Sequence, residues 1–221
     1  MNHRNVLQVF AAVLGACLTW CAQASGGHHA VEDAGLLEPG QCQVEIWQER
    51  GTDHRLTHAG PGCRLGPVEL ALNVDRLREG GTTTVWGPQV KWGTELGAGW
   101  SLGAVWLVNL QDHRPKFSGH TLVLPLTWQA SEDFALHLNL GRDVLRGAAD
   151  RTRRGAALEW QATQRLQLLT EWWDDGSLRH RRAGLRVSLQ KDLTLDFSRA
   201  RHNGPEGQGW WTLGLGWVFD R

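Results

Sequence analysis

Ser118 and His120 come nearest to a hydrolytic centre in residue type and spacing, and Asp112 and His113 lie a few positions before them. Acyl transfer needs a nucleophile, a base and an orienting acid within hydrogen-bond reach of one another. Nothing in the spacing shows that these four side chains converge, and polar residues in connecting segments are commonly solvated. A lipid-modifying enzyme therefore stays an alternative, and we expect no catalytic residue.

Two adjacent histidines, His28 and His29, stand shortly before Glu32 and Asp33 near the start of the chain. Imidazole groups near a chain terminus can bind Cu(II) or Ni(II). An exposed pair, however, lacks the surrounding partners that hold metal ligands in place. We therefore expect neither a metal site nor another cofactor, with His28 and His29 as the weak candidates for a metal.

A third set of polar residues recurs at every second position of alternating segments and would share one face of each. Rings of fixed charge inside a pore set its preference for ions or solutes. Opposite charges on neighbouring strands can instead pair with each other and fill a narrow interior. The sequence leaves both readings open. The candidate interior residues are Glu69, Asp75, Lys91, His137, Glu159, Glu171, His180, Arg182, Arg186 and Asp196.

The elements that position these residues follow from an alternation of apolar and polar residues that runs from Cys42 to the end of the chain. Such period-two segments of about ten residues predict strands with one apolar face. The clearest segments are 68–74, 100–110, 122–128, 134–140, 156–160, 183–189, 193–197 and 211–219, and weaker ones are 42–50, 54–65, 83–93 and 166–173. The sequence therefore predicts an all-β antiparallel barrel of about twelve strands, within a range of 10–12, and no helix.

The connections between these strands alternate between short and long. The short ones are residues 66–67, 96–99, 130–133, 163–165 and 190–192, and polar stretches of greater length stand between them. Short turns at one end and longer loops at the other are typical of an up-and-down transmembrane barrel. We therefore expect both chain termini at the short-turn end, on the periplasmic side.

Tryptophan positions help to decide between a lipid-facing barrel and a soluble one that hides its apolar face inside. Of 13 tryptophans, most lie near the ends of the predicted strands, and the chain has no tyrosine. Indole rings at both membrane interfaces would produce this placement, whereas ordinary core filling is the alternative. The residues expected in two aromatic girdles are Trp86, Trp92, Trp100, Trp128, Trp160, Trp172, Trp211 and Trp217.

The first residues predict export. An apolar run from Val6 to Trp20 precedes an A-x-A exit after Ala24, which is typical of a cleaved signal peptide, and a lipobox-like exit before Cys17 is the alternative. In an exported chain the remaining pair, Cys42 and Cys63, predicts a disulfide. The expected organisation is a signal peptide over 1–24, a periplasmic segment over 25–41 and a barrel over 42–221. The balance of 23 basic and 23 acidic residues argues against a nucleic-acid surface.

A signal peptide, alternating strands, short and long connections in turn and an aromatic last strand together resemble the Gram-negative outer-membrane β-barrel class. The resemblance implies an outer-membrane location, with membrane lipid, lipopolysaccharide and the barrel assembly machinery as partners. Residues 32–47, "EDAGLLEPGQCQVEIW", are also similar to the start of outer-membrane channel proteins of the MetA-pathway phenol-degradation type. Members of the barrel class usually end on an aromatic residue, whereas Asp220 and Arg221 follow Phe219 here.

The expected function is a small channel or solute-binding porin-like protein of unknown substrate. The alternatives are a closed structural or adhesion barrel of the envelope, a soluble periplasmic ligand-binding barrel, and the lipid-modifying enzyme. Arginines in the long connections suit phosphorylated sugars, because a guanidinium pairs bidentately with phosphate. The arginines expected to contact lipopolysaccharide are Arg151, Arg153, Arg154, Arg179, Arg181 and Arg182.

Overall fold

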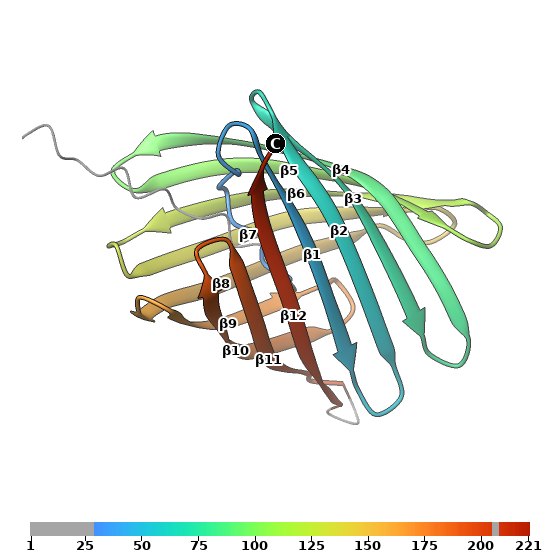
Figure 1. The fold of residues 1–221 in the computed structure, drawn as a ribbon. Coiled ribbons are helices and arrows are strands. Elements are labelled where there is room, and N and C mark those ends of the chain that lie inside the picture. Colours follow the sequence, from blue (N-terminus) through green and yellow to red (C-terminus); the bar gives the residue numbers. More distant parts are fainter. Residues whose placement is uncertain (1–28, 205–207) are drawn as a thin grey trace, which may run out of the picture.

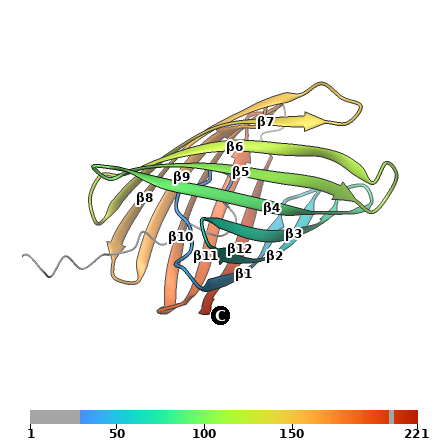
Figure 2. The same cartoon turned by 90° about the horizontal axis from the view of Figure 1, so that it is seen from above.

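A computed structural model describes residues 29–204 and 208–221, and within them the chain forms twelve antiparallel strands that close into one barrel (Figures 1 and 2). The prediction of an all-β, twelve-stranded up-and-down barrel is confirmed. The strands are β1 (Gln41–Arg50), β2 (Arg55–Leu65), β3 (Val68–Arg78), β4 (Thr82–Gly97), β5 (Trp100–Gln111), β6 (Phe117–Gln129), β7 (Phe134–Leu145), β8 (Arg151–Thr163), β9 (Leu166–Asp174), β10 (Arg179–Gln190), β11 (Leu193–His202) and β12 (Gly209–Asp220).

Each strand pairs with its neighbours in sequence, and β1 pairs with β12 to close the barrel. The closing ladder runs from Gln41 opposite Asp220 to Arg50 opposite Trp211. Closure leaves no unpaired sheet edge, so each strand has a hydrogen-bonded neighbour on both sides. In the described part of the chain, no helix is long and apolar enough to cross a membrane.

Short turns gather at one end of the barrel, where Figure 1 also places the C-terminus beside the β2–β3 hairpin. Gly66 opens that turn with φ +62°, a conformation that glycine adopts at little cost. At the other end the strands run beyond their apolar stretch. β8, for example, begins at Arg151, although its apolar alternation begins only at Ala156, because backbone pairing continues where the side chains have become polar.

The two faces of the barrel have opposite chemistry. The outward alternating positions carry exposed apolar side chains, such as Leu140 at 59% and Leu213 at 55% exposure. The inward positions are buried and mostly polar, and Glu171 and Asp196 are only 3% and 1% exposed. A soluble ligand-binding barrel requires the reverse arrangement. The structure therefore contradicts the soluble alternative.

Aromatic side chains lie on the outward face toward both ends. Near the short turns Trp100 stacks on Trp128 and Phe134 stacks on Trp160, with ring centroids 5.6 and 5.8 Å apart. Near the long loops Phe197 stacks on Trp211 at 5.1 Å. All eight tryptophans expected in the girdles face outward, and seven of them are exposed, whereas Trp172 is half-buried. The eight are Trp86, Trp92, Trp100, Trp128, Trp160, Trp172, Trp211 and Trp217.

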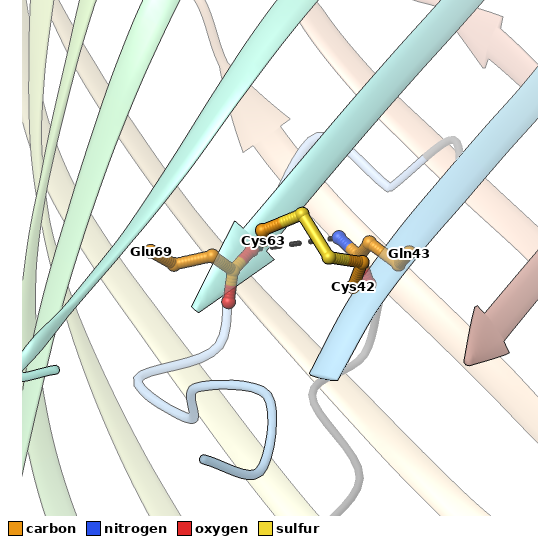
Figure 3. The surroundings of a disulfide bond; sticks show 4 residues. All are labelled: Cys42, Gln43, Cys63 and Glu69. Carbon is orange, nitrogen blue, oxygen red and sulfur yellow. Dashed lines mark hydrogen bonds between the residues drawn. A yellow bond between two sulfur atoms is a disulfide. The ribbon is translucent and has the colours of Figure 1, made fainter. Parts of the chain in front are cut away.

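The expected disulfide joins Cys42 on β1 to Cys63 on β2, which stand directly opposite each other in the ladder (Figure 3). Strand alternation puts Cys42 on the outward side with Phe219 of β12 opposite it. The bond therefore staples the first hairpin beside the seam that closes the barrel.

Candidate functional site

The interior of the barrel is occupied by the chain's own N-terminal segment. Residues 29–40 precede β1 and run inside the ribbon of the barrel (Figures 1 and 2). Residues 30–37 of this stretch, here called the lumen segment, contact inward side chains of the barrel wall. Val31 and Ala34 are each only 2% exposed. The sequence predicted a periplasmic segment over 25–41, and its described part instead enters the barrel.

Glu171 on β9 holds the far end of the lumen segment. Its carboxylate accepts hydrogen bonds from the backbone N–H groups of Ala30 and Val31 at 3.0–3.3 Å. Arg182 on β10 donates to the same carboxylate at 2.8 Å and to Glu49 on β1 at 3.0 Å. Arg182 thus connects Glu171, the carboxylate that binds the lumen segment, to Glu49 on β1, which lies on the other side of the β1–β12 seam.

Lys91 on β4 holds the middle of the lumen segment through charge. Its buried ammonium lies 3.2 Å from Asp33 and 3.9 Å from Glu32. Asn139 on β7 exchanges two hydrogen bonds of 2.7 Å with the backbone of Glu32. Thr127 on β6 accepts the Ala34 N–H at 2.9 Å. The backbone of the segment is therefore satisfied here by side chains of β6 and β7, and its two carboxylates face a lysine of β4.

Glu69 on β3 binds the end of the segment that leads into β1. It accepts the Leu37 N–H at 3.2 Å, and the Gln43 amide reaches its other oxygen at 3.5 Å (Figure 3). The Arg64 guanidinium donates to the Leu37 carbonyl at 2.7 Å. These contacts fix the point at which the chain turns from the interior into the wall.

Two further charge networks line the interior. Thr127 is 2.9 Å from His137, whose other ring nitrogen lies 3.6 Å from Glu159. Arg186 donates to Asp196 at 2.7 Å and lies 3.5 Å from the His29 ring. Opposite charges therefore pair across neighbouring strands, as one of the two readings of the sequence predicted.

Small residues in the wall make room for the segment. A Cβ atom on Gly93 of β4 would collide with the Ala34 carbonyl, and one on Gly155 of β8 would lie 2.7 Å from a Val31 methyl. Val31 itself packs with Trp173 and Trp210 in a buried apolar cluster inside the barrel. The cavity that borders Ala30 and Gly155 has a volume of about 10 Å³, so the wall and the segment are in close contact there.

Aromatic and histidine side chains fill the interior near the long loops. His58 hydrogen-bonds to Asp75 at 2.8 Å and stacks on Trp47. His180 bonds to Asp175 at 2.9 Å and stacks on Trp173. Burial raises the pKa of Asp175, but the N–H groups of residues 178 and 177 and the His180 imidazole outweigh it and hold that pKa below its usual range.

All ten candidate interior residues lie on the inward face, and the structure brings most of them into contact with each other or with the lumen segment. Asp75 is the one with substantial exposure, because it sits near the long-loop end. Sequence reasoning missed Asp33, Glu49, His58 and Asn139 as partners. His58 and Asn139 share the inward parity of their strands and could have been found by it, whereas no periodicity marks residues 29–40.

The suspected hydrolytic residues do not assemble in the described structure. The Ser118 hydroxyl donates to the Asn109 carbonyl at 3.0 Å, and His120 faces outward between β5 and β7. Asp112 is bound by His113 and by the backbone N–H of Thr84, which lower its pKa.

Among the described residues, no group of three or more His, Cys, Asp or Glu side chains could hold a metal ion. His28, the signal peptide and Cys17 lie outside the described residues. His29 lies beside Arg186 at the 3.5 Å given above.

The arginines expected to face lipopolysaccharide divide between the two faces. Arg182 is buried in the interior, and Arg153 points inward to Asp143 at 3.4 Å. The strands extend past the apolar stretch and alternation continues through the basic residues, so these two do not face outward as expected of this set, although Arg182 is also a predicted interior residue. Arg151 has the same parity as Arg153 but is exposed at the start of β8. Arg154, Arg179 and Arg181 do face outward.

Solved structures similar to this chain are outer-membrane barrels. The KdgM porin in complex with disordered oligogalacturonate is 10% identical with a TM-score of 0.68, over 80% of this chain and 99% of that one. The NanC porin is 10% identical with a TM-score of 0.60, over 81% and 99%. Outer membrane phospholipase A from Escherichia coli is 10% identical with a TM-score of 0.53, over 80% and 95%. At these identities the likeness shows a porin-like barrel fold.

A search of curated proteins finds no match to the sequence. A family model does match, and it extends over residues 13–219, so it includes all of β1 to β11 and nearly all of β12. The chain therefore belongs to the family described as Uncharacterised conserved protein UCP029691.

Proposed function

We propose that this protein is an outer-membrane channel for small solutes whose interior is closed by the lumen segment and opens when that segment moves. The observation that carries the proposal is the hydrogen bonding of residues 30–37 to inward side chains of β3, β6, β7 and β9. A barrel sealed only by its own wall would not need an internal segment held by reversible polar contacts.

The outward apolar face supports insertion in a membrane. Leucines and aromatic residues stay exposed around the barrel, including Leu72, Leu124, Leu158 and Leu215. So large an apolar surface is not stable in water, and closed barrels are the β-structures that cross a bilayer. With outward aromatic side chains at both ends, the barrel has the profile expected of an outer-membrane protein.

The hydrogen bonds that hold the lumen segment support the proposal that it can leave the barrel interior. Most contacts to the segment are hydrogen bonds to its backbone, and each has a net worth of only about 0.5–3 kcal/mol, with the higher values for charged partners, because water can replace it. Departure would expose Lys91, Glu69 and Glu171 to the interior. Charges of both signs would then set which small ions or solutes pass. The solute stays a prediction, and the resemblance expected between residues 32–47 and channels of phenol degradation adds phenols to the solutes to test.

Solute uptake by liposomes tests this proposal. Gly93→Val places a side chain where the Ala34 carbonyl lies, so we expect it to displace the segment and to raise the rate of swelling in small neutral, cationic and anionic solutes by severalfold. Gly216→Val is the matched control, because a Cβ there would meet only the Thr194 hydroxyl. Equal swelling rates for Gly93→Val and the control, with both barrels folded, would refute the channel.

A closed structural barrel of the envelope is the second candidate. It is favoured by the buried cluster of Val31, Ala157, Trp173, Ala200 and Trp210, which fills part of the interior with apolar side chains. Such packing is harder to exchange for water than a polar contact. If this candidate is right, no change in the segment will produce a path for solutes.

A further inference from the structure

We propose that the outer face of β8, β10 and β11 binds the phosphate groups of an anionic membrane lipid near the long loops. Five arginines form this surface, here called the basic rim. The proposal rests on the membrane location proposed above but not on closure of the interior. The basic rim consists of Arg154 on β8, Arg179 and Arg181 on β10, and Arg199 and Arg201 on β11.

Strand alternation places the basic rim outside the barrel. Inward neighbours in the same strands are buried, with Arg182 3% and Ala200 0% exposed. Arg199 follows the exposed Phe197 at the next outward position of β11. A ligand of the rim therefore approaches from the surroundings of the barrel and not from its interior.

Among the described residues, the arginines of the basic rim outnumber the carboxylates that contact them. Arg181 stands directly opposite Arg201 in the β10–β11 ladder, and directly opposed like charges destabilise a sheet. Within the described residues neither guanidinium forms an ion pair with a carboxylate. Asp174 is the acid at the rim, 3.1 Å from Arg154 and 3.7 Å from Arg179. Within the described part of the chain this leaves an excess of positive charge at the rim, which an anion would neutralise.

The opposed arginines also border a cavity. Its volume is about 180 Å³, and it is lined by Arg181, Arg201, His202 and Asn203. Guanidinium groups donate paired hydrogen bonds to the oxygens of a phosphate, which are stronger than bonds between neutral groups. The cavity thus offers two such groups and an amide to one anionic headgroup.

The neighbouring aromatic rings identify the anion as part of a lipid. The Arg199 guanidinium lies 4.8 Å from the Trp211 ring centre, and that of Arg154 lies 5.9 Å from Trp172. Outward tryptophans occupy the level of the headgroups in a bilayer. The arginines that contact those rings, and those closer to the long loops, therefore lie at the depth of the lipid phosphates. A polybasic surface at this depth attracts anionic lipid.

Lipid retention by the purified full-length barrel tests the assignment. The barrel is reconstituted in phosphatidylcholine nanodiscs with or without bis-phosphorylated lipid A, and bound lipid A is measured by native mass spectrometry after extraction. We expect Arg181→Gln with Arg201→Gln to weaken retention on the order of tenfold, since each cation near an anionic surface contributes to the attraction. Arg181→Gln alone should give a smaller loss and serves as the milder variant if the pair fails to fold.

The matched control is Arg165→Gln with Lys191→Gln, which removes the same charge from the short turns of the β8–β9 and β10–β11 hairpins. Retention should stay at the wild-type value there. The lipid assignment is overturned if lipid A without phosphates is retained equally well, if the control loses as much as the rim variant, or if inorganic phosphate at equal concentration displaces the lipid completely. None of these outcomes depends on whether the barrel conducts.

Discussion

At the scale of single residues, the interior depends on charges that are buried together. Lys91, Asp33 and Glu171 are between 3% and 5% exposed, and each contacts an opposite charge or a backbone N–H group. Removing one partner of such a pair costs more than the pair contributes, because the other charge is left buried. The contacts that hold the lumen segment are therefore sensitive to single substitutions.

Lys91→Met is expected to loosen the lumen segment. Asp33 and Glu32 would lose the ammonium that faces them at 3.2 and 3.9 Å, a loss on the order of 3 kcal/mol in the free energy of unfolding. Protease digestion of the folded barrel, followed by mass spectrometry of the fragments, should then show cleavage between residues 30 and 37. Lys116→Met is the control, because Lys116 lies in the exposed β5–β6 loop. A segment that stays as resistant as in the wild type would show that Lys91 does not hold it.

At the scale of elements, the alternation of side chains predicted each strand but not its full length. The strand near residue 122 begins at Phe117, and the one near residue 183 begins at Arg179. Backbone pairing does not depend on apolar side chains, so polar extensions carry no periodic signal of their own. The same limit misplaced Arg153, which lies in a stretch that the sequence predicts as a loop, whereas Arg182, at an alternating position, is also predicted to face the interior.

The disulfide between Cys42 and Cys63 is expected to stabilise the barrel. The disulfide closes a loop with a sequence separation of 21 residues, and loss of such a crosslink typically costs about 2–4 kcal/mol. Cys42→Ser with Cys63→Ser should therefore unfold at a lower urea concentration in lipid vesicles, with the barrel fold retained. Reductant should lower the midpoint of the wild type by the same amount and leave the double variant unchanged. Equal midpoints for the oxidised wild type and the variant would contradict a stabilising role.

At the scale of the whole molecule, sequence reasoning reached the barrel and the polarity of its two faces but not what fills it. Glu69, Lys91 and Glu171 could be placed inward because strand parity fixes their side. The lumen segment that contacts them has no such periodicity, because residues 30–37 form neither a strand of the sheet nor a helix. Only the closed three-dimensional arrangement brings Asp33 to Lys91, which is 58 residues away in sequence.

The most direct test of a lumen closed by its own N-terminal segment is single-channel conductance in a planar bilayer, for the full chain and for a variant lacking residues 30–37. We expect a low baseline with rare openings for the full chain and stable steps of conductance for the shortened one. Heat-modifiable migration on SDS gels establishes that both barrels are folded. Equal and continuous conductance in the two proteins, or flat traces in both at high applied voltage, would contradict this expectation.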